Sequence, residues 1–312
     1  MQTFRIYIYI LIISSFSFVS CGLFDKEINQ DQRIGAFRMQ LNAAKDSVIT
    51  PEEKIEVFGA ILSKISEDDV IFNINKKNNL KIDGLVLLCE EYVKLDNYEK
   101  ALAISDSIIS TDSLAAQGYC IRGCVYQTWG DDEKALPFYN KALSLNPAYP
   151  DAYYKRGLIY QAKDELEKAL ADYSMAIKYK LSYPVELYNN RGDIYISRGA
   201  YDEAVQSYME AIKLDSLNSP AYRGRAEAYY MQKKKKEALA DCNQAIRLDS
   251  ANILAYITRA CIYTSMKMYD NAVADYRTVI SLDKQNERNI KAIAESAIKD
   301  LQPYSRISIL QK

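Results

Sequence analysis

The chain has 312 residues, of which 26% are charged and 49% hydrophobic, and its net charge is -1. This composition is typical of an ordered soluble protein rather than a disordered or fibrous one, and the near-neutral charge gives no electrostatic case for nucleic-acid binding. Histidine is absent, which removes both the commonest general base and the commonest metal ligand.

Residues 1–21 have the features of an export signal. Arg5 is the only charged residue, an apolar run extends from Ile6 to Ile13, and small residues precede Cys21. A basic start, a short apolar run and small residues before a boundary are typical of a segment that directs secretion. The run is shorter than the ~20 residues that a membrane-spanning helix needs.

The end of this segment, Phe18-Val19-Ser20-Cys21, resembles a bacterial lipobox, with Phe18 in place of the usual Leu. The resemblance implies that Cys21 is acylated and becomes the first residue of the mature protein. Gly22 follows, not the Asp that retains lipoproteins at the inner membrane under the enteric-type rule, so an outer-membrane location is implied. The alternative is an uncleaved signal anchor with Cys21 as an ordinary thiol.

Residues 22–34 are predicted to form a tether, and residues 35–81 a degenerate helical hairpin followed by a loop. Thr50-Pro51-Glu52-Glu53 is a strong helix start, with a cap residue, Pro at the first helical position and acids in the first turn. Residues 67–81 are polar and rich in Asn and Lys, which predicts a loop or insertion there.

From Ile82 the same residue types return about every 34 residues, and such self-similarity determines the architecture. The eighth position is always small, the eleventh is always Tyr, the twentieth is always Ala, and the twenty-fourth is mostly Tyr. The six predicted repeats are 82–115, 116–149, 150–184, 185–218, 219–252 and 253–286, of which the third is one residue longer than the others.

This pattern resembles the tetratricopeptide repeat over residues 82–286. The resemblance implies an all-α fold, a right-handed α-solenoid of helical hairpins. Small residues at the eighth and twentieth positions would let the two helices of a hairpin approach closely, with Tyr filling the space toward the next hairpin. Each hairpin alone leaves an apolar face open, so neighbours must stack.

The last open face needs a cap, and residues 287–312 are predicted to supply a capping helix and a tail. The helix is expected over residues 287–302 because one apolar stripe runs along it. Its members are Ile290, Ile293, Ala294, Ala297, Ile298 and Leu301.

The resemblance also implies a concave groove that holds a peptide, lined by the second, fifth, ninth, twelfth and thirteenth positions. In the central repeats these positions mix Tyr, amides and both charge signs, as a peptide-binding surface would. They are Gln127, Tyr154, Gln161, Asn189, Asp193, Arg223, Glu227 and Tyr230. The alternative is a solvated helix face without a ligand. Val86 and Glu90 in the first repeat do not match the residues that clamp a terminal carboxylate in chaperone-binding members.

Two further patterns have structural interpretations that we favour. Arg recurs at the seventh position and Asp at the twenty-third, which predicts either an anion-binding ladder or an Arg–Asp pair across each hairpin; repetition in register favours the pair. Cys120 and Cys124 lie one helical turn apart, where their parallel side chains cannot form a disulfide without distorting the helix. Two thiols without a further ligand are weak evidence for metal, and buried thiols are the favoured interpretation.

No catalytic residue, metal site or cofactor is predicted, so the chain is expected not to be an enzyme. We predict a lipid-anchored adaptor of the bacterial envelope that binds a protein or peptide partner in its groove. A non-catalytic regulatory subunit of a cell-wall or glycan-processing enzyme is the alternative. Neither a small-molecule substrate nor nucleic acid is an expected partner.

Overall fold

The computed structural model describes residues 30–68, 73–283 and 290–305. In this part of the chain every regular element is helical, which confirms the all-α prediction. The elements are α2 (Gln30–Asp46), α3 (Pro51–Glu67), α4 (Ile74–Lys94), α5 (Tyr98–Thr111), α6 (Ala116–Thr128), α7 (Asp132–Leu145), α8 (Pro150–Ala162), α9 (Leu166–Lys178), α10 (Val185–Ser197), α11 (Tyr201–Leu214), α12 (Ser219–Met231), α13 (Lys235–Leu248), α14 (Ile253–Ser265), α15 (Tyr269–Leu282), α16 (Ile290–Leu301) and the short 3₁₀-helix η2 (Gln302–Tyr304).

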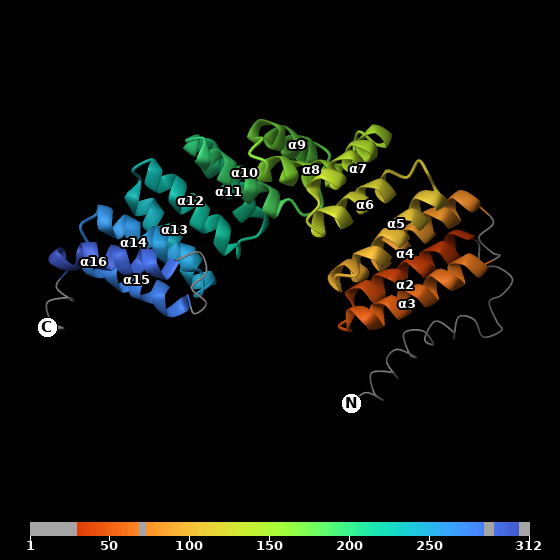
Figure 1. Ribbon diagram of the computed structural model, residues 1–312, viewed down its shortest axis with the longest axis horizontal. Coiled ribbons are helices and arrows are strands. Elements are labelled where there is room, and N and C mark those ends of the chain that lie inside the picture. Colours follow the sequence, from red (N-terminus) through yellow and green to blue (C-terminus); the bar gives the residue numbers. More distant parts are fainter. Residues whose placement is uncertain (1–29, 69–72, 284–289, 306–312) are drawn as a thin grey trace, which may run out of the picture. The chain divides into compact units, whose positions relative to one another are not determined.

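The chain forms two compact units, a first unit of residues 1–159 and a second unit of residues 160–312. Within each unit, helices follow one another as antiparallel pairs (Figure 1). The first helices of successive repeats contact each other, as α4 and α6 do in the first unit and α10, α12 and α14 do in the second. The second helices α5, α7, α11, α13 and α15 each contact the first helix of their own repeat. The repeats thus form two layers within each unit.

The first unit begins with α2, α3 and α4, which pack on one another around an apolar core that includes Phe58, Ile65 and Leu80. Thr50 caps α3 as its sequence predicts: Glu53 N donates to Thr50 Oγ1 at 3.3 Å, and Thr50 N donates to Glu53 Oε2 at 2.9 Å. This reciprocal pair satisfies two backbone donors that a helix start otherwise leaves open.

Two of the expected boundaries are wrong. The loop predicted over 67–81 is shorter, because α4 begins at Ile74. Asn73 supplies the cap by accepting from Lys76 N at 3.1 Å, and Leu80 is fully buried in the core, so a polar sequence still gains a helix from one cap and one apolar anchor. The predicted tether 22–34 also ends early, since α2 begins at Gln30.

The tyrosine at the twenty-fourth position fills the space between neighbouring first helices. Tyr208 on α11 is 1% exposed, and a Cβ added at Gly192 of α10 would lie 2.5 Å from its Cζ atom. A Cβ at Gly224 of α12 would overlap the same ring. Only glycine therefore lets α10 and α12 close around this ring at these two points. Gly192 lies at the eighth position, which was predicted to permit close helix approach, whereas Gly224 lies at the sixth position of its repeat, which was not.

Each repeat turns between its two helices through one residue in the left-handed conformation at its fifteenth position. The six residues are Asp96, Gly130, Asp164, Gly199, Lys233 and Lys267. The turn closes with two backbone bonds, for example Asn97 N to Tyr92 O at 2.9 Å and Asp96 N to Val93 O at 3.0 Å. This pair of bonds satisfies the last carbonyls of the first helix.

The C-terminal helix α16 packs against α15 and covers its apolar face. Ala294 and Leu301 are buried, and Ile290, Ala297 and Ile298 are partly buried against the same core. Ile293 is 60% exposed, so its assignment to the capping stripe is wrong. The stripe is narrower than predicted because only one side of the helix meets α15. The expected helix residues 287–289 lie outside the described residues.

Candidate partner-binding surface

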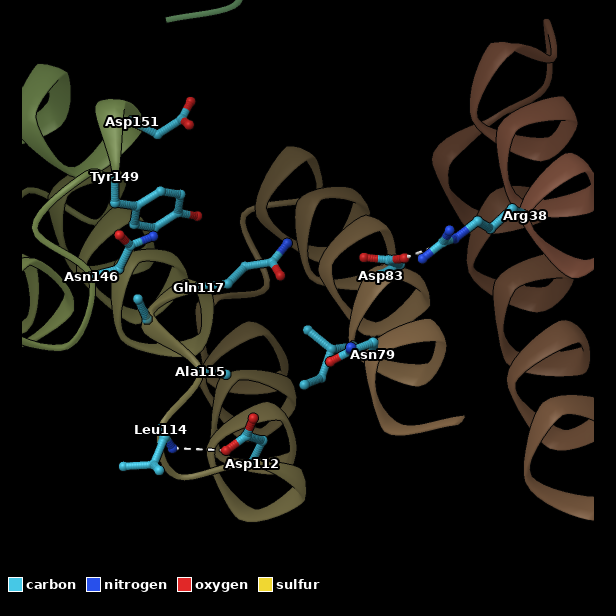
Figure 2. A pocket seen from close by; sticks show the side chains of 12 residues that line it. Arg38, Asn79, Asp83, Asp112, Leu114, Ala115, Gln117, Asn146, Tyr149 and Asp151 are labelled. Atoms are coloured by element: carbon cyan, nitrogen blue, oxygen red, sulfur yellow. Dashed lines mark hydrogen bonds and ion pairs between the residues drawn. The ribbon is translucent and has the colours of Figure 1, made fainter. Parts of the chain in front are cut away.

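A polar cavity of about 660 Å³ lies in the first unit, where α2, α4 and α6 meet the turns before α6 and α8 (Figure 2). Three of its residues, Asp83, Gln117 and Asp151, occupy the second position of consecutive repeats. In Figure 2 the side chains of Asp83 and Gln117 extend into the same space from α4 and α6. The full lining is Arg38, Asn79, Ile82, Asp83, Asp112, Leu114, Ala115, Ala116, Gln117, Asn146, Tyr149 and Asp151.

The charges of this cavity are predominantly acidic. Arg38 Nε lies 3.6 Å from Asp83 Oδ2. Burial raises the pKa of the Asp83 carboxyl, and Arg38 opposes that shift. Asp112 is used locally, because its Oδ1 accepts from Leu114 N at 2.9 Å in the turn before α6. Asp151 is exposed. The cavity therefore combines an acidic edge with amides and one phenol, a lining that suits polar groups of a partner.

None of these lining residues was among the predicted groove residues, although three of them share the second position of the repeat. The second position was among those expected to face the groove, yet the selected residues came from the central repeats, and the cavity lies at the first three. The contribution of Arg38 could not be found from the repeats, because α2 precedes them in the chain.

In the first unit, the predicted groove residue Gln127 supports the core. Its Oε1 accepts from the hydroxyl of the buried Tyr139 at 2.7 Å, and its Nε2 donates to Lys155 O at 3.4 Å. Tyr154 is half-buried, with Lys155 Nζ 5.9 Å from the centre of its ring. Gln127 thus links a core tyrosine to α8, and Tyr154 presents part of its ring to solvent.

In the second unit, Gln161 and Asp193 have the same role as Gln127. Gln161 Oε1 accepts from the Tyr173 hydroxyl at 2.6 Å, and Asp193 Oδ1 accepts from the Tyr208 hydroxyl at 2.6 Å. Burial raises the pKa of Tyr208, which keeps the phenol a neutral donor. These groove residues are therefore fixed by the core beneath them.

Asn189 connects successive repeats of the second unit. Its Nδ2 donates to Asn218 Oδ1 at 3.1 Å, and the same oxygen caps α12 by accepting from Ala221 N at 2.9 Å. Asn189 Oδ1 is buried without a hydrogen-bond partner. The residue thus supports the cap of the next repeat while leaving an acceptor unsatisfied.

Arg223 and Glu227 form a charged pair on α12. Arg223 Nη1 lies 2.8 Å from Glu227 Oε2, and Arg223 Nη2 lies 3.9 Å from Asp193 Oδ1. Tyr230 is half-buried on the same helix. The structure therefore brings Asp193, Arg223 and Glu227 together in a small ionic network across α10 and α12.

The arginines of the seventh position are structural. Arg225 donates twice to Asp241, at 2.7 and 2.8 Å, and Arg259 donates twice to Asp275, at 2.8 and 2.7 Å. These Arg–Asp pairs cross a single hairpin, as the favoured interpretation predicts. Arg191 instead donates to Ser207 Oγ at 3.0 Å. The arginines are occupied within the fold and do not form an anion ladder.

The predicted lipidation site, Cys21, lies outside the described residues. None of the described helices is both long and apolar enough to span a bilayer.

The fold and this surface define an α-solenoid repeat protein, and the comparisons with known proteins give its family. A family model described as "TPR repeat" matches residues 125–164 and 192–233. Models described as "Tetratricopeptide repeat" match residues 150–183, 253–286 and 219–252. The chain belongs to the tetratricopeptide repeat family. The matches begin at residue 125, so the repeat assigned to 82–115 stays a prediction.

Solved structures with the same fold share little sequence with the chain. YrrB, described as a TPR protein with an unusual peptide-binding site, is 18% identical, with a TM-score of 0.53 over 62% of this chain and 97% of that one. The C-terminal part of a TPR protein from Cytophaga hutchinsonii is 17% identical, with a TM-score of 0.53 over 85% and 99%. MamA from Desulfovibrio magneticus is 14% identical, with a TM-score of 0.51 over 55% and 97%. A search of curated proteins gives no match.

Proposed function

We propose that the chain is a non-catalytic scaffold that binds a protein or peptide partner on the surface formed by the first helices of its repeats. The observation that carries the proposal is the open polar cavity of the first unit, lined by the second position of three consecutive repeats. Its amides, phenol and carboxylates are groups that recognise a peptide backbone and polar side chains. YrrB, which shares the fold, is described as having a peptide-binding site.

The groove residues of the second unit support the same function. The network of Asp193, Arg223 and Glu227 presents both charge signs, and it is held in place by the Tyr208 hydroxyl below Asp193. A preorganised polar surface loses less side-chain entropy when a partner binds. Tyr154 and Tyr230 add half-buried rings, the residue type that contributes most to interface energies.

A site-specific photo-crosslinker tests where the partner binds. Placed at Gln117 in the cavity, it should give a discrete crosslinked product with the partner in cells. The matched control is Lys141, which is exposed on the second helix α7 and should give none. Equal crosslinking at both positions would place the binding surface elsewhere. The identity of the product also distinguishes an assembly partner from a cell-wall or glycan-processing enzyme.

The predicted groove residues are tested by substitution, with Tyr154 in the first unit and Asn189 and Arg223 in the second. Replacing Tyr154, Asn189 and Arg223 together by Ala should abolish capture of the crosslinked partner without unfolding the chain. Circular dichroism and thermal melting establish that the triple variant is folded. A folded variant that captures the partner as well as the parent would exclude these residues from the binding surface.

We further propose that the scaffold is a lipoprotein anchored through Cys21 at the outer membrane of the bacterial envelope. The support is the export-signal pattern of residues 1–21 and the lipobox resemblance. Labelling with a fatty-acid probe should mark the parent chain and not Cys21→Ala, and the variant should leave the membrane fraction. Equal labelling of the two chains would contradict the anchor while leaving the scaffold proposal intact.

A further inference from the structure

The only tryptophan of the chain, Trp129, lies exposed at the end of α6. It is 51% exposed, and the ring of Tyr98 at the start of α5 stacks on it, with the ring centres 5.5 Å apart and 16° between the planes. The Tyr98 hydroxyl donates to Asp96 Oδ1 at 2.6 Å, which fixes this ring. Because Tyr98 covers only one face, part of the indole is open to solvent. Tryptophan is enriched among the residues that dominate binding energies, so this ring is a candidate contact for a partner.

Two shallow hollows share Trp129 as a wall. One, of about 430 Å³, is formed with the turn before α5, and the other, of about 510 Å³, with the turn before α7. Both linings contain carboxylates, which are Asp96, Glu99, Asp131, Asp132 and Glu133. Trp129 follows the cavity residue Gln117 by twelve residues on α6, which corresponds to about 18 Å along the helix. The hollows are therefore separate from the polar cavity at the start of α6.

The carboxylates of the two hollows outnumber the cations. Among the described residues that line them, the only cation is Lys134, and its Nζ lies 2.6 Å from Asp131 Oδ2, so that these two charges neutralise each other. Glu99 and Glu133 are exposed and Asp132 is half-buried. Within the described part of the chain these three carboxylates belong to no ion pair. The open indole thus lies in a region of net negative charge.

Helix stabilisation accounts for only part of this arrangement. Acids in the first turn of a helix are favoured by its dipole, and Glu99, Asp132 and Glu133 lie in the first turns of α5 and α7. However, α4 and α6 end in the same two turns, and the C-terminal end of a helix carries the opposite partial charge. An exposed indole gains nothing from either helix end. The combination of an open aromatic ring and unpaired carboxylates instead suits a cation.

We propose that Trp129 and its flanking carboxylates bind an arginine-containing segment of a partner protein. The planar guanidinium lies over the face of the indole that Tyr98 leaves uncovered, where the ring quadrupole attracts a cation. Glu99 in one hollow and Glu133 in the other accept hydrogen bonds from guanidinium N–H groups, and such charge-assisted bonds are the strong ones. A segment with two arginines fills both hollows. The site uses none of the residues of the polar cavity, so either site can fail without the other.

The structure disfavours other occupants of these hollows. An acidic segment or a phosphate meets like charge from the carboxylates around Trp129. A purely apolar segment removes water from Glu99 and Glu133 without offering them a partner, which costs free energy. Among the described residues no group of three or more His, Cys, Asp or Glu side chains could hold a metal ion. A cation with a flat, weakly hydrated surface satisfies both the ring and the carboxylates.

The test is a titration of the full chain with a fluorescently labelled, amidated peptide in which four arginines alternate with glycines. Binding is followed by the anisotropy of the label, and in parallel by the emission of Trp129 with the unlabelled peptide. Because the chain has one tryptophan, its emission reports this site alone, and it should change and saturate. The same peptide with citrulline in place of arginine keeps the shape and loses the charge, and it should bind at least ~10-fold more weakly.

Substitutions separate the contributions of charge and ring. Glu99→Gln with Glu133→Gln should weaken binding of the arginine peptide at least ~10-fold, and Trp129→Leu should weaken it about 5-fold. The matched control is Glu203→Gln with Glu237→Gln, which removes two exposed carboxylates near the starts of α11 and α13. That variant should bind the peptide as tightly as the parent chain does.

Several outcomes would overturn the proposal. They are equal affinity for the arginine and citrulline peptides, undiminished binding by the folded Glu99→Gln, Glu133→Gln variant, and binding that leaves the emission of Trp129 unchanged. Absence of binding by the parent chain would overturn it as well. Circular dichroism of each variant shows whether the helices persist, so that loss of the site and loss of structure are distinguished. Crosslinking at Gln117 tests the polar cavity independently of these results.

Discussion

The repeats 82–149 in the first unit and 219–286 in the second share their backbone and differ in the polar contacts that hold it. In 219–286 the seventh-position arginines pair with buried aspartates of their own hairpin, as Arg259 does with Asp275. In 116–149 the twenty-third position is Phe138, and the guanidinium of Arg122 lies over its ring at 5.2 Å while it pairs with Asp106 of the preceding repeat. The seventh-position arginine thus stabilises either its own hairpin or the contact between two successive repeats.

The helices that carry a side-chain cap also differ between the two regions. In 82–149 the second helices are capped, because Asn97 and Asp131 accept from Lys100 N and Lys134 N. In 219–286 Lys234 and Met268 precede the second helices α13 and α15 without forming a side-chain cap, and the first helices α12 and α14 are capped by Asn218 and Asn252. What stays constant is the small residue at the eighth position and the left-handed turn. The twenty-fourth position is Tyr in 116–149 and 253–286, but Ser105 and Cys242 in the other two repeats. Steric fit therefore specifies the repeat, and the polar contacts are interchangeable.

The largest expected difference between the two regions is in the pKa of a cysteine thiol. The Cys120 thiol, the Lys155 ammonium and the Tyr139 hydroxyl lower the pKa of Cys124 to about 7, although burial and the charge of Asp151 act to raise it, whereas burial raises the pKa of Cys242 to about 12. A lowered pKa means that alkylation of Cys124 by iodoacetamide should speed up as the pH rises through neutrality and then level off. Cys242 should stay unmodified. Mass spectrometry of the digested protein measures both, and a Cys124 midpoint near ~8.5, that of an ordinary thiol, would contradict the expectation.

The shared steric fit should be the most sensitive feature of the fold. Gly123→Ala and Gly224→Ala each place a methyl group against a rigid tyrosine ring and should lower the free energy of unfolding by about 3 kcal/mol. Gly59→Ala on α3 meets no atom within 4 Å and should stabilise by ~0.5–1 kcal/mol. Urea denaturation compares the three variants. Similar effects at all three positions would show that the ring contacts do not limit the helix spacing.

The arginine partners should differ in strength between the regions. Asp275→Ala leaves Arg259 with its hydrogen bond to Asn243 Oδ1 but no charged partner, and it should cost about 2 kcal/mol, less than breaking a fully buried pair because Arg259 is 18% exposed. Asp106→Ala should cost less than ~0.5 kcal/mol, since Asp106 is 60% exposed and water replaces its contact. Thermal melting of the two variants measures the contrast. Equal losses of stability would show that burial does not determine how much these ion pairs contribute to it.

Removal of a tyrosine hydroxyl should give a smaller difference in stability between the two regions. Tyr139→Phe removes a 2.7 Å hydrogen bond to Gln127 and should cost about 1 kcal/mol. Tyr276→Phe removes only a 3.6 Å contact with Cys261 Sγ and should cost a few tenths, roughly, because sulfur is a weak partner. Denaturant midpoints of both variants decide the matter. A larger loss of stability from Tyr276→Phe than from Tyr139→Phe would contradict the expectation that the hydrogen bond to Gln127 is the stronger of the two.

Substitutions at the left-handed turns should change the free energy of unfolding by at most about 1 kcal/mol, with opposite signs in the two regions. Lys267→Gly relieves the strain of a side chain at φ 61° and should stabilise by roughly 0.5 kcal/mol. Gly130→Ala, at φ 88° with open space around it, should destabilise by about 1 kcal/mol. Melting temperatures of the two variants report the signs, and a destabilised Lys267→Gly would mean that chain entropy outweighs backbone strain there.

Sequence reasoning succeeded where a residue type recurs. Small residues and tyrosines returned at fixed spacing, and they predicted both the helical pairs and their close approach. It failed where a requirement is met by different residues. The fifteenth position is left-handed in every repeat, yet it carries Asp, Gly and Lys, so no pattern of residue types marked it. The Asn-rich start of α4 was mistaken for a loop because its anchor, Leu80, is a single residue.

The candidate surface was only partly predictable for a related reason. The predicted groove positions carry polar residues, but Gln127, Gln161 and Asp193 accept hydrogen bonds from the hydroxyls of core tyrosines. A sequence shows that a side chain is polar and cannot show which neighbour uses it. Likewise, the cavity of the first unit needs Arg38, which comes from a helix that precedes the repeats.

Repeat length, helical class and family follow from the amino-acid sequence alone, because small residues and tyrosines at a fixed interval allow few packing arrangements. Which polar groups are occupied within the fold, and where a cavity remains, became apparent only in the folded structure. Those features depend on distances between residues that are far apart in the chain, and such distances exist only once the hairpins have stacked.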